Sequence, residues 1–393
     1  MWEVIRKKYD GYGDGVVENQ EINFATNNQH IAKFSCKPNP KEQDPNSCTP
    51  GYGALLYTKI NKLTQSDNEI LVIKSVRSLH DLYKADTKNI TASILYTEDK
   101  LIPNLVDLLK KDFAREDVLR TLCKSYKAKI ARDQVIPHVE EIQQFILNNY
   151  KTENPTNIYL TLKLFKGVCF EKEPCKIVTD TGVLPVLTMK CLNHFQQKDM
   201  NPKVMKNGFK LLNNLLQVPK THVVLVEEDQ IFLLVEDIFE HHPTDEKILI
   251  SLMEHISKLS FYTDGLTKCG RFIYYIMPHL RSKNQILLLE SINALSHITI
   301  SVEAKCQIMD RESQIKKQFI ANLVHVFDGY QKEYQNDYIF INNLKIICNL
   351  AEKDRPSLLF LLPKIMDLVV LSTTNESVKE ELENTYRIIS YKP

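Results

Sequence analysis

This sequence of 393 residues has almost no excess of one charge over the other, a single tryptophan and no long apolar run. Lys+Arg number 50 against 49 for Asp+Glu, so the basic excess typical of nucleic-acid-binding proteins is absent. No stretch approaches the ~18 consecutive apolar residues of a membrane-spanning helix, and the first residues lack the apolar core of a signal peptide. We therefore expect neither nucleic acid nor a membrane among the partners of this protein.

Catalytic and metal-binding motifs are also missing. The nine cysteines include no Cys-x-x-Cys pair, which is typical of reduced thiols in an intracellular protein. Residues 11–15 alternate glycine with other residues, but they do not form the Gly-x-Gly-x-x-Gly motif of nucleotide-binding loops. His241 and His242 are adjacent, and adjacent helical side chains point about 100° apart, so they are poorly placed to share a metal ion. We expect a protein that is not an enzyme and that uses no cofactor, no metal and no small-molecule substrate.

Glycine numbers only 11, and five of these fall among the first 53 residues. Residues 1–50 also hold four prolines, and turn-forming residues at this density do not support a long helix. One interpretation of this segment is a solvated tail. The other is an extended arm that becomes ordered on a partner, with apolar anchors that a solvated tail rarely needs: Trp2, Ile5, Phe24, Ile31 and Phe34.

From residue 52 the apolar side chains have helical spacing, and residues 182–216 show the unit that recurs. Gly182 ends a short helix, and Pro185 lies in the first turn of the next, where its missing N–H has no acceptor. A longer helix follows the turn at Asn201-Pro202 and closes on the run Leu-Leu-Asn-Asn-Leu-Leu at residues 211–216. A short helix, a helix opened by an apolar-Pro step and a helix ending in Leu-x-Asn-Leu together form an armadillo-type unit.

Two independent features repeat with nearly the same period. The position of Leu184 recurs from Ile102 to Leu362 in six steps of about 43 residues, within the ~40–47 expected of armadillo and HEAT repeats. The position of Asn214 recurs at Asp81, Lys124, Gly167, Lys258, His297 and Asn349. We therefore predict an all-α, right-handed superhelical solenoid of about eight armadillo/HEAT-like repeats with an extended N-terminal arm. Its parts are the arm (residues 1–50), the solenoid (51–372) and a capping helix of the last repeat (373–393).

The third helices of an armadillo stack line a concave groove, and the position of Asn214 is expected to face it. The residues two before and one after this position should then be buried, and six of the seven such pairs are wholly apolar. One turn earlier on the same face, five of seven residues are basic. A lysine-rich, solvated helix surface is one interpretation of this stripe. We instead predict a groove for an acidic, extended segment of another protein, lined by Arg77, Asp81, Arg120, Lys124, Lys163, Lys210, Asn214, Lys258, His297, Lys345 and Asn349.

This repeat pattern is similar to that of the importin-alpha nuclear-import receptors, which hold basic cargo with a Trp four residues before each groove Asn. No Trp occupies that position here, and the Asn survives only as Asn214 and Asn349. A basic groove would also repel basic cargo, so this family is disfavoured. An armadillo adaptor of the catenin type, with basic grooves for acidic ligands, stays open.

Residues 52–82 resemble the opening of the radial spoke head protein 14 family without a gap over about 31 residues. The match includes Tyr52-Gly53, Lys59-Ile60-Asn61, Gln65-Ser66 and Leu79-His80-Asp81-Leu82, although the arm of 50 residues is longer than that family leads us to expect. The resemblance implies a structural subunit of the radial spokes of motile cilia and flagella, located in the axoneme. Such a scaffold would bind other radial spoke or axonemal proteins and help to transmit signals that regulate dynein-driven motility. The alternative is a soluble cytoplasmic adaptor that binds acidic extended peptides in signalling or transport.

Overall fold

The structure is a computed structural model, and it describes residues 54–84, 94–95, 98, 100–180, 183–197, 200–227, 229–241, 244–310, 314–330, 332–371 and 375–391. In this described part the regular elements are all helices, and the single non-helical pairing is an isolated bridge between Tyr330 and Tyr334. Contacts divide the chain into two compact units, with the boundary between Val218 and Pro219.

The helices of the N-terminal unit fall into four repeats. The first contains α3 (Ala54–Thr64) and α4 (Glu69–Lys84), and the second contains α6 (Leu101–Leu108) and α7 (Asp112–Ser125). The third contains α8 (Lys129–Val135), η2 (Ile136–His138), α9 (Val139–Ile142), η3 (Gln143–Leu147) and α10 (Pro155–Val168). The fourth contains α11 (Lys172–Thr179), α12 (Val183–Gln197) and α13 (Pro202–Leu215).

The C-terminal unit continues the same order of helices. Its first repeat contains α14 (Pro219–Glu227), α15 (Gln230–His241) and α16 (Glu246–Leu259). The second contains α17 (Thr263–Cys269), η4 (Gly270–Phe272), α18 (Ile273–Ile276), η5 (Met277–Arg281) and α19 (Gln285–Ile298). The last two contain α20 (Val302–Met309), α21 (Gln314–Gly329) and α22 (Asp337–Asp354), then η6 (Pro356–Leu361), α23 (Leu362–Leu371) and α24 (Glu376–Ser390).

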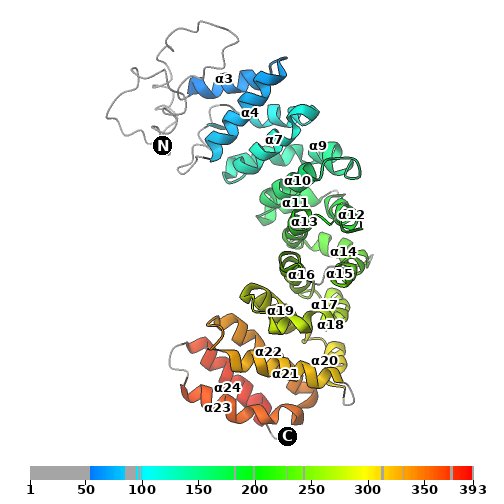
Figure 1. The fold of residues 1–393 in the computed structure, drawn as a ribbon, viewed down its shortest axis with the longest axis vertical. Coiled ribbons are helices and arrows are strands. Elements are labelled where there is room, and N and C mark those ends of the chain that lie inside the picture. The colour runs from blue at the N-terminus through cyan, green and yellow to red at the C-terminus, as the bar shows by residue number, and fades with distance from the viewer. Residues whose placement is uncertain are drawn as a thin grey trace, which may run out of the picture. The chain divides into compact units, whose positions relative to one another are not determined.

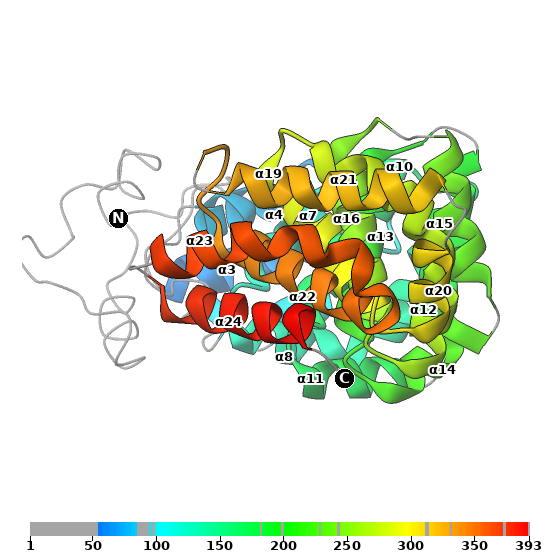
Figure 2. The same ribbon diagram turned by 90° about the horizontal axis from the view of Figure 1, so that it is seen from below.

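Within each unit, the last helix of a repeat, here called the third helix, packs against the third helix of the next repeat. In the N-terminal unit α4, α7, α10 and α13 follow one another in this way, and in the C-terminal unit α16, α19, α22 and α24 do the same (Figure 1). Figure 2 shows the C-terminal end of the second unit, where α24 packs against both α22 and α23. This ladder of third helices is the arrangement that the repeated Asn214 position predicts.

Proline and asparagine set where the helices begin. Pro103, Pro185 and Pro363 each lie in the first turn of a helix, as the apolar-Pro pattern predicts. Most third helices begin at a side-chain cap, in which an Asn or Asp oxygen accepts the backbone N–H groups that a helix start leaves unpaired, and α7, which follows Lys111, is an exception. Asn201, for example, accepts from the N–H of Lys203 at 3.1 Å and of Val204 at 3.3 Å. Equivalent caps begin five further third helices, at Asn154, Asp245, Asn284, Asn336 and Asn375.

The predicted register of the third helices is confirmed by burial. All fourteen residues at the positions two before and one after the Asn214 position are buried. Phe165 and Val168 of α10, and Leu212 and Leu215 of α13, have no exposed surface at all. These side chains form the core between neighbouring third helices, so the opposite edge of each helix faces away from that core.

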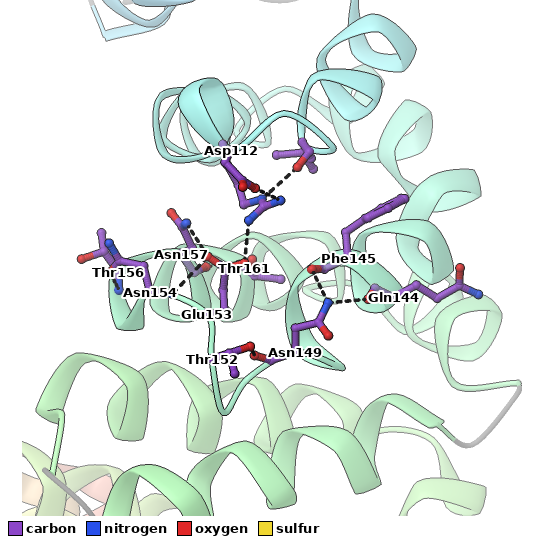
Figure 3. Close-up of polar contacts among 12 residues, drawn as sticks. Asp112, Gln144, Phe145, Asn149, Thr152, Glu153, Asn154, Thr156, Asn157 and Thr161 are labelled. Atoms are coloured by element: carbon purple, nitrogen blue, oxygen red, sulfur yellow. Dashed lines mark hydrogen bonds and ion pairs between the residues drawn. The ribbon is translucent and has the colours of Figure 1, made fainter.

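Polar contacts also link one repeat to the next. Arg115 of α7 donates from Nη1 to Oε2 of Glu153 at 2.8 Å and from Nε to the carbonyl oxygen of Leu109 at 2.8 Å. Glu153 in turn accepts from the side chain of Asn157 in α10 at 2.9 Å (Figure 3). Only 14% of the Arg115 side chain and 9% of the Glu153 side chain are exposed. The second and third repeats are therefore joined by a largely buried ion pair as well as by apolar packing.

Candidate functional site

The first two basic positions of the predicted groove already have carboxylate partners. Arg77 on α4 is exposed, and its Nε donates to Oδ2 of Asp117 on α7 at 2.9 Å. Arg120 on α7 is also exposed, and its Nη2 lies 2.6 Å from Oε1 of Glu116 one turn earlier. Ion pairs at such exposed positions contribute only about 0–1 kcal/mol, so a stronger anion could replace either partner. These two arginines therefore carry little uncompensated charge.

The next two third helices differ sharply, because α10 and α13 carry five lysines and no aspartate or glutamate. Four of these lysines form what we call the lysine cluster: Lys163, Lys166, Lys203 and Lys206. In the described part of the chain no carboxylate forms an ion pair with any of the four. The fifth, Lys210, is half-buried and stands one turn before Asn214, as predicted.

Tyr159 of α10 brings lysines of both helices around one ring. The Nζ of Lys163 lies 5.7 Å from the centre of the ring, and the Nζ of Lys203 lies 5.8 Å from it. Lys163 Nζ also donates a long hydrogen bond of 3.5 Å to the phenol oxygen. Each cation–π contact of this kind is worth about 0.5–1 kcal/mol at an exposed site. The ring thus orders two ammonium groups that would otherwise repel each other.

Lys166 is the most constrained member of the lysine cluster. Burial lowers the pKa of its ammonium group, and the positive charges of Lys210, Lys163 and Lys206 lower that pKa further. Its Nζ has a neutral hydrogen-bond partner, the side-chain oxygen of Asn207 at 3.2 Å. A bound anion would offset both the lost hydration and the repulsion, because an opposite charge favours the charged form of a lysine.

The positive field of this surface continues onto α7. Cys123 is buried there, and burial raises the pKa of its thiol to about 12. Four positive charges act against that shift, those of Lys163, Lys166, Lys124 and Arg120. Lys124 also opposes the charging of His80 on α4, whose pKa is lowered first of all by burial. The predicted residues Arg120, Lys124 and Lys163 therefore lie close enough to share one field.

The two groove asparagines bond to the preceding third helix. Asn214 donates from Nδ2 to the carbonyl oxygen of Lys166 at 2.9 Å. Asn349 donates from Nδ2 to the carbonyl oxygen of Ser296 at 3.2 Å and to the hydroxyl oxygen of Thr299 at 3.1 Å. Both amides thus satisfy carbonyl groups near the end of a neighbouring helix, where intrahelical partners run out.

In the C-terminal unit the predicted positions gather around an aromatic ring. Phe261 is 63% exposed, the Nζ of Lys258 lies 5.7 Å from its ring centre, and the ring of His297 lies 4.4 Å from it. Nδ1 of His297 is 3.1 Å from the hydroxyl oxygen of Ser257, and burial lowers the pKa of this imidazole. Lys345 on α22 is exposed, and its charge also disfavours protonation of His297.

Asp81 is half-buried on α4, with its Oδ1 3.7 Å from Nδ1 of His80. The proposed arm anchors Trp2, Ile5, Phe24, Ile31 and Phe34 lie outside the described residues, as does Gly182.

Within the described ranges no group of three or more His, Cys, Asp or Glu side chains is arranged to hold a metal ion. The same ranges contain no single helix that is long and apolar enough to cross a membrane, and α19 and α20 reach that length and composition only as a pair bent by 111°.

The predicted groove did not include Tyr159, Lys166, Lys203 and Lys206. These residues do not stand at the position of Asn214 or one turn before it, and only those two positions were used for the prediction. A simpler signal was present in the sequence. Residues 155–168 and 202–215 are two successive third-helix segments that contain lysine and lack Asp and Glu. Counting acidic residues in each third helix would have located the lysine cluster.

The comparisons with known proteins bear on the fold. No family model matches this chain, and no curated protein matches it. Among solved structures, an engineered protein matches 93% of this chain and 82% of its own, with 15% identity and a TM-score of 0.69. A designed armadillo repeat protein matches 62% of this chain and 98% of its own, with 14% identity and a TM-score of 0.50. At such low identity the likeness shows the fold alone, and that fold is an all-α armadillo-like solenoid.

Proposed function

We propose that this protein is a non-enzymatic scaffold whose N-terminal unit binds an acidic, extended segment of a partner protein at the lysine cluster. An armadillo-type fold suggests a protein-binding scaffold, and the site is supported by one observation above the others. Lys163, Lys166, Lys203 and Lys206 stand on two adjacent third helices without a carboxylate partner in the described part of the chain. Clustered charge of one sign speeds the association of an oppositely charged ligand.

An extended segment suits the spacing of the third helices. Packed helices lie about 8–10 Å apart, and an extended chain advances about 3.3 Å per residue. A partner that crosses α10 and α13 would therefore place a side chain against a new helix at about every third residue. Acidic side chains at that interval would meet Lys163 and Lys166 on α10 and then Lys203 and Lys206 on α13.

The test is the affinity of a short fluorescein-labelled peptide of Gly and Ser with an aspartate at every third position, measured by fluorescence anisotropy. The same peptide with asparagine at those positions is the control ligand. The triple variant K163Q/K203Q/K206Q should weaken the Kd at least about tenfold, because three contacts of about 0.5 kcal/mol are lost. Circular dichroism and the Tm should show that the variant stays folded.

The matched control variant is K129Q/K172Q/K190Q. It removes the same charge from exposed lysines on α8, α11 and α12, away from the third helices. Its Kd should stay within about twofold of the wild type. If both triple variants weaken peptide binding equally, the loss of affinity follows from the change in net charge alone. Unchanged affinity in K163Q/K203Q/K206Q would show that the lysine cluster is not the binding site.

For the assembly that the scaffold serves, we propose a radial spoke of the axoneme, where it would bind several spoke proteins and help to regulate dynein. The resemblance of residues 52–82 to the radial spoke head protein 14 family supports this proposal. Several of those residues have packing roles: Ile60, Leu79 and Leu82 are buried. Asn61 donates to Oε2 of Glu98 at 2.8 Å and accepts from Asn104 at 2.6 Å. A stacked fold also offers a separate surface on each repeat to different partners.

The competing proposal is a soluble cytoplasmic adaptor that captures acidic peptides in signalling or transport. Fractionation separates the two, with the tagged protein expressed in a ciliated cell. A spoke subunit should remain with axonemes after a salt wash that strips weakly held proteins, and an adaptor should move into the soluble pool. Recovery of the protein only from the soluble pool would end the axonemal proposal and leave the lysine cluster to be tested on its own.

A further inference from the structure

The arm contains a long stretch in which every Asp, Glu, Lys or Arg residue is acidic. Between Lys8 and Lys33 the sequence has no lysine or arginine, and it holds four carboxylates at Asp10, Asp14, Glu18 and Glu21. Three of the 11 glycines lie among them, at positions 11, 13 and 15. This acidic stretch lies outside the described residues. Its sequence has the negative charge of the ligand that the lysine cluster would bind, and its glycines place few steric limits on the backbone.

The lysine cluster has the opposite sign and a comparable spacing. Neighbouring carboxylates of the acidic stretch are three or four residues apart, which is about 10–13 Å in an extended chain. The axes of two packed helices such as α10 and α13 are about 8–10 Å apart. Successive carboxylates could thus reach Lys163 on one helix and Lys203 or Lys206 on the next.

The chain between the two is long enough for the contact. Residues 22–53 connect Glu21 to Ala54, the first residue of α3, and these 32 residues can span up to about 110 Å. In the stack of third helices, α10 comes two helices after α4, a step of about 20 Å. Tethering of this kind gives a local concentration of about 1 mM, so even a weak contact is populated.

We propose that the acidic stretch, residues 10–21, occupies the lysine cluster of its own chain and competes there with the partner. The competition rests on the proposed function, whereas the contact within the chain can be observed without any partner. A tethered segment at about 1 mM with an intrinsic Kd of about 0.1 mM would raise the apparent Kd of the partner about tenfold. A partner would then need an acidic segment that binds the lysine cluster more tightly than residues 10–21 do.

The first experiment is zero-length carbodiimide cross-linking of the full chain, which joins a carboxylate to an ammonium group only when the two touch. Mass spectrometry should find Asp10, Asp14, Glu18 or Glu21 linked mainly to Lys163, Lys203 and Lys206. Lys172 and Lys190 are exposed on α11 and α12 and report random encounters of the arm. A mixture of isotopically labelled and unlabelled chains separates links within a chain from links between chains. Links spread evenly over the cluster and the two reporter lysines would overturn the proposal.

The second experiment measures competition in the full chain. The variant D10N/D14N/E18Q/E21Q should bind the acidic peptide probe about tenfold more tightly than the wild type. The difference should vanish when K163Q/K203Q/K206Q is added to both chains. Equal probe affinity in the wild type and the neutralised arm, together with absent cross-links, would reject the internal contact while the partner site stands. Cross-links to the cluster without any probe binding would reject the proposed partner while the internal contact stands.

Discussion

The guanidinium of Arg115 and the carboxylate of Glu153 form a 2.8 Å ion pair between two successive repeats, with 14% and 9% of the side chains exposed. Arg115→Ala would leave Glu153 largely buried without its cation and would free the carbonyl oxygen of Leu109. Removing one partner of such a pair is costly, and we expect a loss of about 2 kcal/mol in the free energy of unfolding. Urea denaturation followed by circular dichroism measures it.

The control for this substitution is an ion pair that is exposed. Lys110 lies 2.8 Å from Asp107 and 2.7 Å from Glu141, and 44% of its side chain is exposed. Lys110→Ala should therefore cost much less stability than Arg115→Ala, because solvent screens an exposed pair. If the two substitutions lower the free energy of unfolding equally, burial does not explain the contribution of the Arg115 pair to stability.

Gly208 of α13 packs against Leu192 of α12 so closely that a Cβ atom would meet its Cδ2 at 2.4 Å. Alanine is favoured over glycine in a helix by about 1 kcal/mol, but overpacking a core costs about 1–3 kcal/mol. Gly208→Ala should therefore lower the free energy of unfolding by about 1 kcal/mol despite its better helix propensity. Gly270→Ala is the matched control, since its Cβ would approach only Oε1 of Gln307 at 3.9 Å. A stabilised Gly208→Ala variant would show that Leu192 moves aside freely.

The fold could be predicted from the sequence because its signals are local and periodic. Leu212 and Leu215 occupy positions that recur along the third helices and are buried in each, and six of the seven such pairs are wholly apolar. The boundary between Val218 and Pro219 has no comparable signal, since the helix pattern runs across it without a break. Repeat periodicity predicts which residues face the core of a repeat. It does not predict where neighbouring repeats make fewer contacts.

The candidate site could be predicted only in part, because charge pairing depends on neighbours that are far apart in sequence. Arg77 and Lys163 stand at equivalent positions, yet Arg77 has a carboxylate partner, Asp117, 40 residues away on the next third helix. Lys163 meets Tyr159 and Lys203 instead. The pattern of one helix face thus predicts where a charge stands, and the composition of the adjacent helix decides whether it is compensated.

His255 of α16 is fully buried, and burial lowers its pKa from 6.5 to about 3. The native state keeps this imidazole neutral, whereas the unfolded chain takes up a proton below pH 6.5, so stability is lost as the pH falls through that value. One such histidine costs about 2 kcal/mol between pH 7 and pH 5. The variant His255→Gln cannot titrate, so its unfolding free energy should change less over this interval. Identical pH profiles from urea denaturation would mean that His255 is protonated in the native state.

Lys166 links the stability of the N-terminal unit to its proposed binding site. Its ammonium group is held partly out of water and near Lys210, Lys163 and Lys206, which lowers its pKa and destabilises the folded unit. Lys166→Gln removes this repulsion and can still donate a hydrogen bond toward Asn207. Like-charge neighbours each cost about 0.2–0.5 kcal/mol, so we expect a gain of about 0.5–1 kcal/mol in stability.

The same substitution should weaken binding of the acidic peptide, because it removes a positive charge from the lysine cluster. Stability and affinity would then change in opposite directions, as expected of a site whose charges are compensated only by a ligand. The measurements are the Tm of the free protein and the Kd by anisotropy, with Lys172→Gln on α11 as the control. A variant that loses both stability and affinity would show that Lys166 is a structural residue, held by Asn207 rather than kept for an anion.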